Sequence, residues 1–90
     1  MSKVYSLSEM RRKNKESGLY FFQKGNPRVE AKYGNYLVTK GMGEGYVIYR
    51  FFDDGHTELI DNPSGEYSWQ PYNSKSDAVN YAKKLNQANK

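Results

Sequence analysis

The chain has 90 residues, a formal net charge of +4 and no cysteine, and aromatic residues make up 16% of it. This length suits one domain with a small core, so residues 1–90 are predicted to form a single domain. The absence of cysteine excludes disulfides and thiolate metal sites and fits a reducing cytosol. The chain also lacks the long apolar run of a membrane span and the apolar region of a secretion signal.

Charge is unevenly distributed along the chain. Residues 1–40 carry nine Lys or Arg and three Glu, whereas residues 41–73 carry six acidic residues and Arg50 as their one basic residue. A basic surface attracts a polyanion and an acidic hairpin repels one, although ordinary solubility charge also explains such totals. Because burying like charges together is costly, we expect the basic and acidic runs to lie on different surfaces.

A helix is predicted over residues 7–16. Ser6 and Glu9 have the spacing of a capping box, in which each side chain accepts a bond from the other residue's backbone N–H. Gly18 is placed to end the helix. The apolar stripe of this helix is thin, and the rest of it is basic, so it either presents a solvated face or faces phosphate.

Short apolar or alternating runs follow, and they predict an antiparallel sheet of about five strands. The central hairpin joins residues 45–52 to residues 57–60 through a turn at residues 53–56, because Asp and Gly tolerate the backbone angles of a tight turn. The other segments predicted as strands are 19–22, 28–33, 36–40 and 66–72.

A second helix is predicted at the end of the chain. Ser74 and Asp77 have capping-box spacing at its start. Four apolar residues recur at helical spacing: Ala78, Val79, Ala82 and Leu85. This helix is expected to pack across the one buried face of the sheet, with Trp69 as a core anchor beside it. The order helix, strands, helix predicts an α+β domain with an N-terminal helix and a C-terminal helix packed on the sheet.

Catalytic and metal-binding chemistry finds little support in the sequence. His56 is the only histidine. It lies in a turn beside Asp53 and Asp54, where neither a nucleophile nor a supporting ligand shell is indicated. The glycine-rich segment 41–45 lacks the lysine and the hydroxyl of a phosphate-binding loop. We therefore predict no enzyme activity, no catalytic residue, no metal, no cofactor and no small-molecule substrate.

Tyrosine gives the stronger signal, because nine occur in the chain and most fall on or beside predicted strands. Alternation should place some rings on the outer face of the sheet, next to cations. Exposed rings beside cations can stack on the bases of single-stranded nucleic acids, or they can form a protein interface. The third alternative is that all the rings belong to the core. The predicted partner-binding residues are Arg11, Arg12, Lys13, Lys15, Arg28, Lys32, Tyr33, Tyr36 and Lys40.

The whole chain resembles a family of small, uncharacterised proteins from bacteriophages and prophages. The motifs that carry the resemblance are N-x-x-x-G-x-Y-F-F at 14–22, G-N-Y-L-V-T at 34–39, Y-V-I-Y-R-F at 46–51 and A-x-x-x-A-K-x-L at 78–85. The family has a second aromatic cluster after its first strand, where this chain has K-G-N-P-R at 24–28. The resemblance implies a phage accessory protein that acts in the host cytoplasm, and it brings no catalytic residues.

Residues 45–88 also resemble the arm-site DNA-binding domain of phage integrases, in which three antiparallel strands precede a helix. The pattern aromatic-x-S/T-K-x-x-A matches at residues 72–78. In such domains basic residues on the sheet contact DNA. Here the equivalent strands carry Arg50 alone among the acidic residues.

Two functions remain as hypotheses. The first is a small phage-encoded interaction protein that binds and modulates a host protein or nucleoprotein complex, such as a nucleic-acid-handling or CRISPR-type defence complex. The second is a module that binds DNA or RNA through the basic helix and the basic, aromatic face of the sheet. Neither hypothesis involves a membrane.

Overall fold

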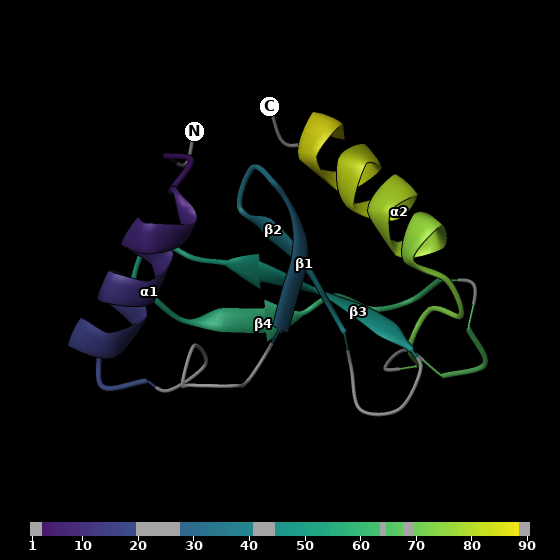
Figure 1. Ribbon diagram of the computed structural model, residues 1–90, viewed down its shortest axis with the longest axis horizontal. Helices are drawn as coiled ribbons and strands as arrows, with labels where there is room; N and C mark the ends of the chain where they lie inside the picture. Colours follow the sequence, from purple (N-terminus) through teal and green to yellow (C-terminus); the bar gives the residue numbers. More distant parts are fainter. Residues whose placement is uncertain (1–2, 20–27, 41–44, 64, 68–69, 89–90) are drawn as a thin grey trace.

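The fold is α+β, with two helices and a four-stranded antiparallel sheet (Figure 1). The structure is a computed structural model that describes residues 3–19, 28–40, 45–63, 65–67 and 70–88. The helices are α1 (Leu7–Glu16) and α2 (Lys75–Ala88). The strands are β1 (Arg28–Tyr33), β2 (Tyr36–Lys40), β3 (Tyr46–Phe51) and β4 (Thr57–Leu59), and they lie side by side in chain order.

The described residues contain four strands, where the sequence predicted about five. Of the predicted strand 66–72 the structure describes residues 66, 67 and 70–72, and among these only Tyr72 pairs, through a single antiparallel bridge to Tyr46. The N–H of Gln70 donates instead to the carbonyl of Tyr67, three residues earlier, at 3.1 Å. Pro71 has no N–H to give to a ladder. The described residues of this segment therefore form a turn and a single bridge in place of a strand. The predicted strand 19–22 falls mostly outside the described residues.

Helix α2 packs on one face of the sheet, which confirms the prediction from its apolar stripe. Ala78 and Ala82 are fully buried, and they lie in one hydrophobic cluster with Val38 and Ile48. Two alanines facing the sheet allow the helix backbone to come close to the strands. Trp69, predicted to anchor this helix, lies outside the described residues.

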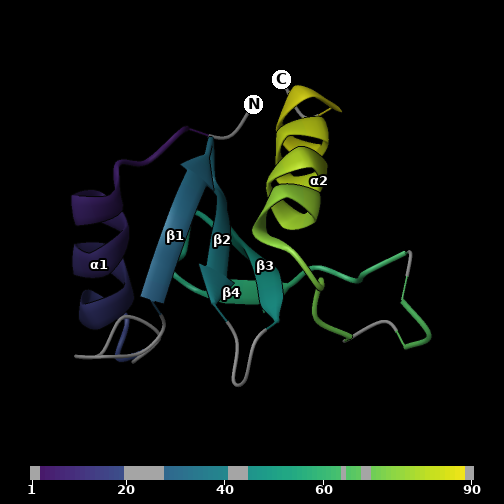
Figure 2. The same cartoon turned by 45° about the vertical axis from the view of Figure 1, so that its right-hand side comes forward.

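The opposite face of the sheet is also buried, which corrects the expectation of one buried face. Alternation along β2 turns Val38 toward α2 and Leu37 toward the other side. Leu37 joins Tyr5, Met10 and Phe51 in a second hydrophobic cluster. Helix α1 therefore lies on the side of the sheet away from α2 (Figure 2). The expectation failed because β2 and β3 carry large apolar side chains on both faces.

Helix α1 occupies the residues predicted for it. The Ser6 hydroxyl accepts from the Glu9 N–H at 3.2 Å, and the Glu9 carboxylate accepts from the Ser6 N–H at 3.0 Å. The Ser6 N–H and the Lys3 ammonium stabilise the charged carboxylate and lower the pKa of Glu9 to about 2. Gly18 follows the helix with a φ of +76°, so the predicted capping box and helix end are both confirmed.

Helix α1 rests against the acidic turn between β3 and β4. The Asn14 side chain is buried and donates to the Gly55 carbonyl at 2.8 Å, and the Ser17 hydroxyl donates to the Asp54 carbonyl at 2.7 Å. A Cβ on Gly55 would lie 2.8 Å from the Lys13 carbonyl oxygen. The expectation that the basic helix and the acidic turn lie on different surfaces was wrong, because side chains of α1 and its C-terminal end donate hydrogen bonds to carbonyl groups of the turn.

Candidate functional site

The predicted basic residues of α1 form a solvated face. Arg11, Arg12 and Lys15 are exposed. Arg12 makes a long ion pair of 3.9 Å with Glu16, one turn along the helix. Lys13 is half-buried, and its ammonium lies 5.5 Å from the centre of the Tyr5 ring. This face offers positive charge to solvent, beside the acidic turn that α1 contacts.

The basic sheet residues of the predicted site lie in two separate places. Arg28 and Lys40 are cross-strand partners at one end of the β1–β2 hairpin, and both are exposed. Lys32 is the partner of Leu37, which faces the α1 side of the sheet. The nine predicted residues therefore do not converge on one surface.

The two tyrosines of the predicted site lie on the α2 side of the sheet. Tyr36 is 4% exposed and belongs to the core cluster beneath α2. Tyr33 is half-buried at the edge of that cluster, and the Lys83 ammonium lies 5.4 Å from its ring centre. Burial therefore closes the Tyr36 ring to stacking on a nucleic-acid base, and the Lys83 ammonium already lies over the Tyr33 ring.

His56 is the centre of a side-chain cluster on the β3–β4 turn. Its ring stacks on Phe52, with centroids 4.5 Å apart and planes 3° from parallel, and the Arg50 guanidinium lies 4.8 Å from the Phe52 ring centre. Nε2 lies 2.8 Å from a Glu58 oxygen, and Nδ1 contacts an Asp54 oxygen. Hydrogen bonds to Glu58 and then Asp54 raise the pKa of His56, because an imidazolium can donate from both nitrogens.

The contacts of His56 with Phe52, Asp54 and Glu58 stabilise the β3–β4 turn. Both ring nitrogens are engaged by carboxylates, so neither is free to take a proton from a third group. The turn brings Asp54 to His56, since the His56 backbone N–H also donates to the Asp54 carboxylate at 3.0 Å. The available signal in the sequence was the two carboxylates that lie two residues before and two residues after the histidine. Among residues that the structure describes, no group of three or more His, Cys, Asp or Glu side chains could hold a metal ion.

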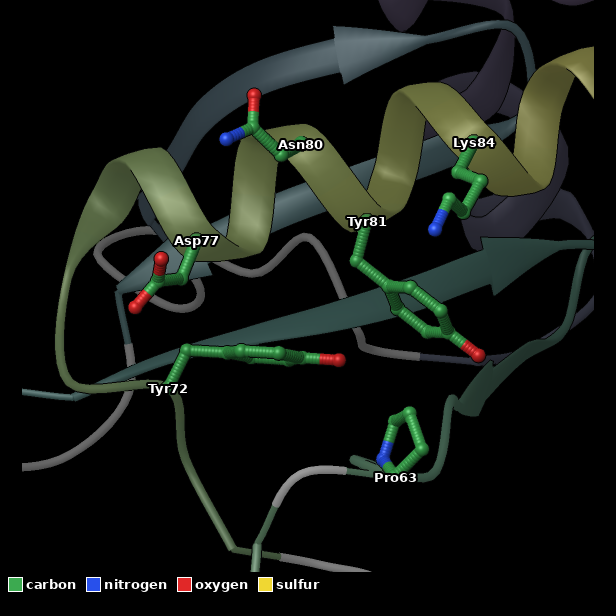
Figure 3. A pocket seen from close by; sticks show the side chains of 6 residues that line it. All are labelled: Pro63, Tyr72, Asp77, Asn80, Tyr81 and Lys84. Atoms are coloured by element: carbon green, nitrogen blue, oxygen red, sulfur yellow. The ribbon is translucent and has the colours of Figure 1, made fainter.

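A groove lies beside α2, and we call it the α2 groove (Figure 3). Its volume is about 420 Å³. One wall is a stripe of α2 at helical spacing, and the other comes from the segment after β4 and from Tyr72, three residues before α2 begins. The residues lining the groove are Pro63, Tyr72, Asp77, Asn80, Tyr81 and Lys84.

Tyr72 supplies the floor of the α2 groove and an unsatisfied polar atom. It is 6% exposed, and its hydroxyl has no hydrogen-bond partner among the described residues. Burial, with a contribution from Tyr81, raises the pKa of Tyr72 to about 12. Two backbone hydrogen bonds to Tyr46, of 2.7 and 2.9 Å, fix its position. Figure 3 shows the hydroxyl directed to the space between Tyr81 and Pro63.

The sequence did not single out this groove. Tyr81 lies outside the apolar stripe predicted for the last helix, and Tyr72 is one of several tyrosines on or beside predicted strands. The available signal was the recurrence of polar and aromatic residues at positions 77, 80, 81 and 84, beside the apolar stripe of the same helix. Tyr72 and Pro63 lie on two other segments of the chain, so only the tertiary structure places them opposite these residues of α2.

The described residues thus form an α+β fold with a groove beside α2 that two tyrosine rings line. No family model, curated protein or solved structure matches the chain. Neither helix is long and apolar enough to cross a membrane, as far as the described part of the chain extends. The resemblance to phage proteins therefore stays a prediction.

Proposed function

We propose that this chain is a small interaction protein without enzymatic activity, and that it binds a partner protein through the α2 groove. The Tyr72 hydroxyl supports this proposal most directly. A buried hydroxyl without an acceptor costs about 1–3 kcal/mol, so a partner that supplies an acceptor gains affinity from a group already in place. Two tyrosine rings within one groove also suit protein binding, since tyrosine is enriched in interfaces.

The charges of the α2 groove favour a protein over a nucleic acid. Asp77 and Lys84 lie seven residues apart on one face of α2, so the groove carries both signs of charge. A polyphosphate backbone gains from Lys84 and is repelled by Asp77. A peptide can complement both, because it can carry a basic and an acidic side chain.

The phage resemblance suggests the cell in which the partner is found. We propose a partner in the cytoplasm of a bacterial host, belonging to a nucleic-acid-handling or defence complex such as a CRISPR effector. This part of the proposal rests on the sequence motifs and not on the groove. It makes the host lysate the natural source in which to search for the partner.

The experiment is capture from a nuclease-treated bacterial lysate, with the purified, tagged chain as bait. Asn80→Arg places a bulky charge in the groove, and Lys83→Arg alters the neighbouring side of the same helix while keeping its charge. We expect a protein retained at stoichiometric yield by the wild type and by Lys83→Arg, and lost with Asn80→Arg. Recovery of no such protein, or equal retention by all three baits, would reject the proposal.

Nucleic-acid binding remains a second candidate, because Arg11, Arg12 and Lys15 are exposed on α1. Titration of labelled DNA and RNA at low salt tests it by fluorescence anisotropy. Binding through α1 should weaken steeply as salt rises, since each neutralised phosphate releases counterion. The double variant Arg11→Glu with Arg12→Glu should weaken this binding and flatten its salt dependence. No binding by the wild type at low salt would eliminate this candidate.

A further inference from the structure

We infer that the occupant of the α2 groove is a proline-containing segment of the partner in the polyproline II conformation. This inference rests on the proposed function, because it names the chemical class of ligand for the same groove. It follows from three properties of the groove: its balance of donors and acceptors, the arrangement of its rings, and the spacing of its charges.

Four of the five polar side chains that line the groove can donate a hydrogen bond. These are the Tyr72 and Tyr81 hydroxyls, the Asn80 amide and the Lys84 ammonium, whereas the Asp77 carboxylate can only accept. Neither tyrosine hydroxyl has a hydrogen-bond partner among the described residues. A ligand with free carbonyl groups can accept from these donors.

Proline-rich segments have this composition of backbone groups. Proline has a carbonyl and no N–H, and the polyproline II helix makes no internal hydrogen bonds, so its carbonyls point outward and are available. An α-helical ligand has satisfied most of its own backbone groups. A β-strand ligand needs a ladder of alternating donors and acceptors, and α2 presents side chains to the groove.

The rings of the groove provide apolar surfaces of suitable shape. The Tyr72 and Tyr81 ring centres lie 6.2 Å apart, and their planes are inclined by 37°. The two rings thus form an open wedge, with Pro63 opposite (Figure 3). Pyrrolidine rings pack against such aromatic surfaces, and the preformed polyproline II conformation loses little entropy on binding.

Ligand entry requires movement around the Tyr72 hydroxyl, because this atom is buried. The Tyr81 ring lies beside Tyr72 (Figure 3) and is half-buried, and no hydrogen bond to another described residue holds its hydroxyl. Rotamer changes of accessible side chains are fast. We therefore expect rotation of the Tyr81 ring to admit a ligand carbonyl.

The charges at the two ends of the groove set the direction of the segment. Asp77 and Lys84 are separated by about 10 Å along the helix axis, at 1.5 Å per residue. A polyproline II chain covers this distance in about three residues, at 3.1 Å each. We therefore expect a basic residue near Asp77, a core of about three residues that includes proline, and an acidic residue near Lys84.

The test uses the synthetic peptide acetyl-Lys-Pro-Pro-Pro-Glu-amide, titrated into the ¹⁵N-labelled protein and followed by NMR. We expect saturable shifts of the Asn80 side-chain amide and of backbone amides at residues 77–84. The matched peptide acetyl-Lys-Gly-Gly-Gly-Glu-amide has the same charges and should bind about tenfold more weakly, because it is not preorganised. Equal binding of both peptides, or no binding of the proline peptide, would overturn the inference.

The variant Tyr72→Phe removes the hydroxyl and keeps the ring. We expect it to bind the proline peptide about three- to tenfold more weakly, as loss of one hydrogen bond predicts. Its thermal unfolding midpoint should be equal to that of the wild type or higher, because the unsatisfied hydroxyl is gone. A lower midpoint with unchanged peptide binding would show that the hydroxyl is paired inside the fold and would overturn the inference.

Competition separates failure of this inference from failure of the proposed function. If a captured partner binds in a manner sensitive to Asn80→Arg but is not displaced by the proline peptide, the ligand class is wrong and the interaction function stands. If the peptide binds as expected but no partner is captured from host lysate, the ligand class stands and the proposed host function fails.

Discussion

The two helices cover opposite faces of one small sheet, and they are attached by different kinds of contact. Helix α2 uses two fully buried alanines, Ala78 and Ala82, packed in one cluster with Ile48. Helix α1 adds hydrogen bonds to the backbone of a distant turn, from Asn14 and Ser17. A helix with a thin apolar stripe can therefore still be held against the fold, if its polar side chains donate hydrogen bonds to backbone carbonyl groups that lack another donor.

The segment before α1 strengthens the same kind of attachment. Asn35, in the β1–β2 turn, accepts from the Tyr5 N–H at 2.9 Å and donates to the Lys3 carbonyl at 2.7 Å. The Tyr5 hydroxyl donates to Asp53 at 3.1 Å. Burial and this hydrogen bond raise the pKa of the Tyr5 hydroxyl. Because a ten-residue helix is marginal alone, these contacts with two turns are needed for α1 to persist.

The largest effect should come from truncating the cluster beneath α1. Phe51 is 1% exposed and meets the edge of the Tyr5 ring, with centroids 5.5 Å apart. We expect Phe51→Ala to lower the free energy of unfolding by about 3–5 kcal/mol, measured by urea denaturation. Leu59→Ala is the control, because Leu59 is 39% exposed, and its change should stay within about 0.5 kcal/mol. Similar losses in both variants would refute the second core.

The attachment of α2 is tested by adding volume where the helix meets the sheet. Ala82 is fully buried, so Ala82→Leu should overpack the interface and cost about 1–3 kcal/mol in chemical denaturation. Ala88→Leu makes the same change at an exposed position of the helix. Hydrogen exchange should accelerate in α2 more than in α1. Unchanged stability of Ala82→Leu would mean that α2 does not approach the sheet so closely.

The polar attachment of α1 is tested at Asn14. Asn14→Ala removes the donor to the Gly55 carbonyl and should cost about 1–3 kcal/mol, because a buried acceptor loses its partner. Hydrogen exchange should accelerate in α1 and leave α2 protected, which is the reverse of the Ala82→Leu pattern. Lys15→Ala, at the exposed neighbouring position, is the control. Equal acceleration in both helices would show that their attachments are coupled.

The smallest effect should be a pH dependence from the turn on which α1 rests. Hydrogen bonds to Glu58 and Asp54 raise the folded-state pKa of His56 above its usual value of 6.5. Its stabilisation is therefore present below about pH 6.5 and is lost as pH rises through the higher folded-state pKa. NMR titration of this single histidine gives the pKa directly. His56→Gln should remove this part of the pH profile, and a titration midpoint at or below 6.5 would contradict the prediction.

Features that depend on neighbours along the chain were predictable from the sequence alone. The capping box of Ser6 and Glu9 set the start of α1, and the turn chemistry around Gly55 set the β3–β4 hairpin. The helical stripe through Ala78 and Ala82 identified the face of α2 that packs on the sheet. Each of these signals lies within a few residues, where sterics and hydrogen bonding act locally.

Contacts between distant groups were not predictable in this way. Asn14 lies 41 residues from Gly55, and nothing in their local sequences indicates that one would donate to the other. The α2 groove likewise needs Tyr72 and Pro63 opposite a helix stripe whose own spacing does not reveal what it faces. Hydrogen-bond partners and groove walls depend on the relative placement of whole elements. That placement is fixed by packing of both sheet faces at once, which local periodicity does not encode.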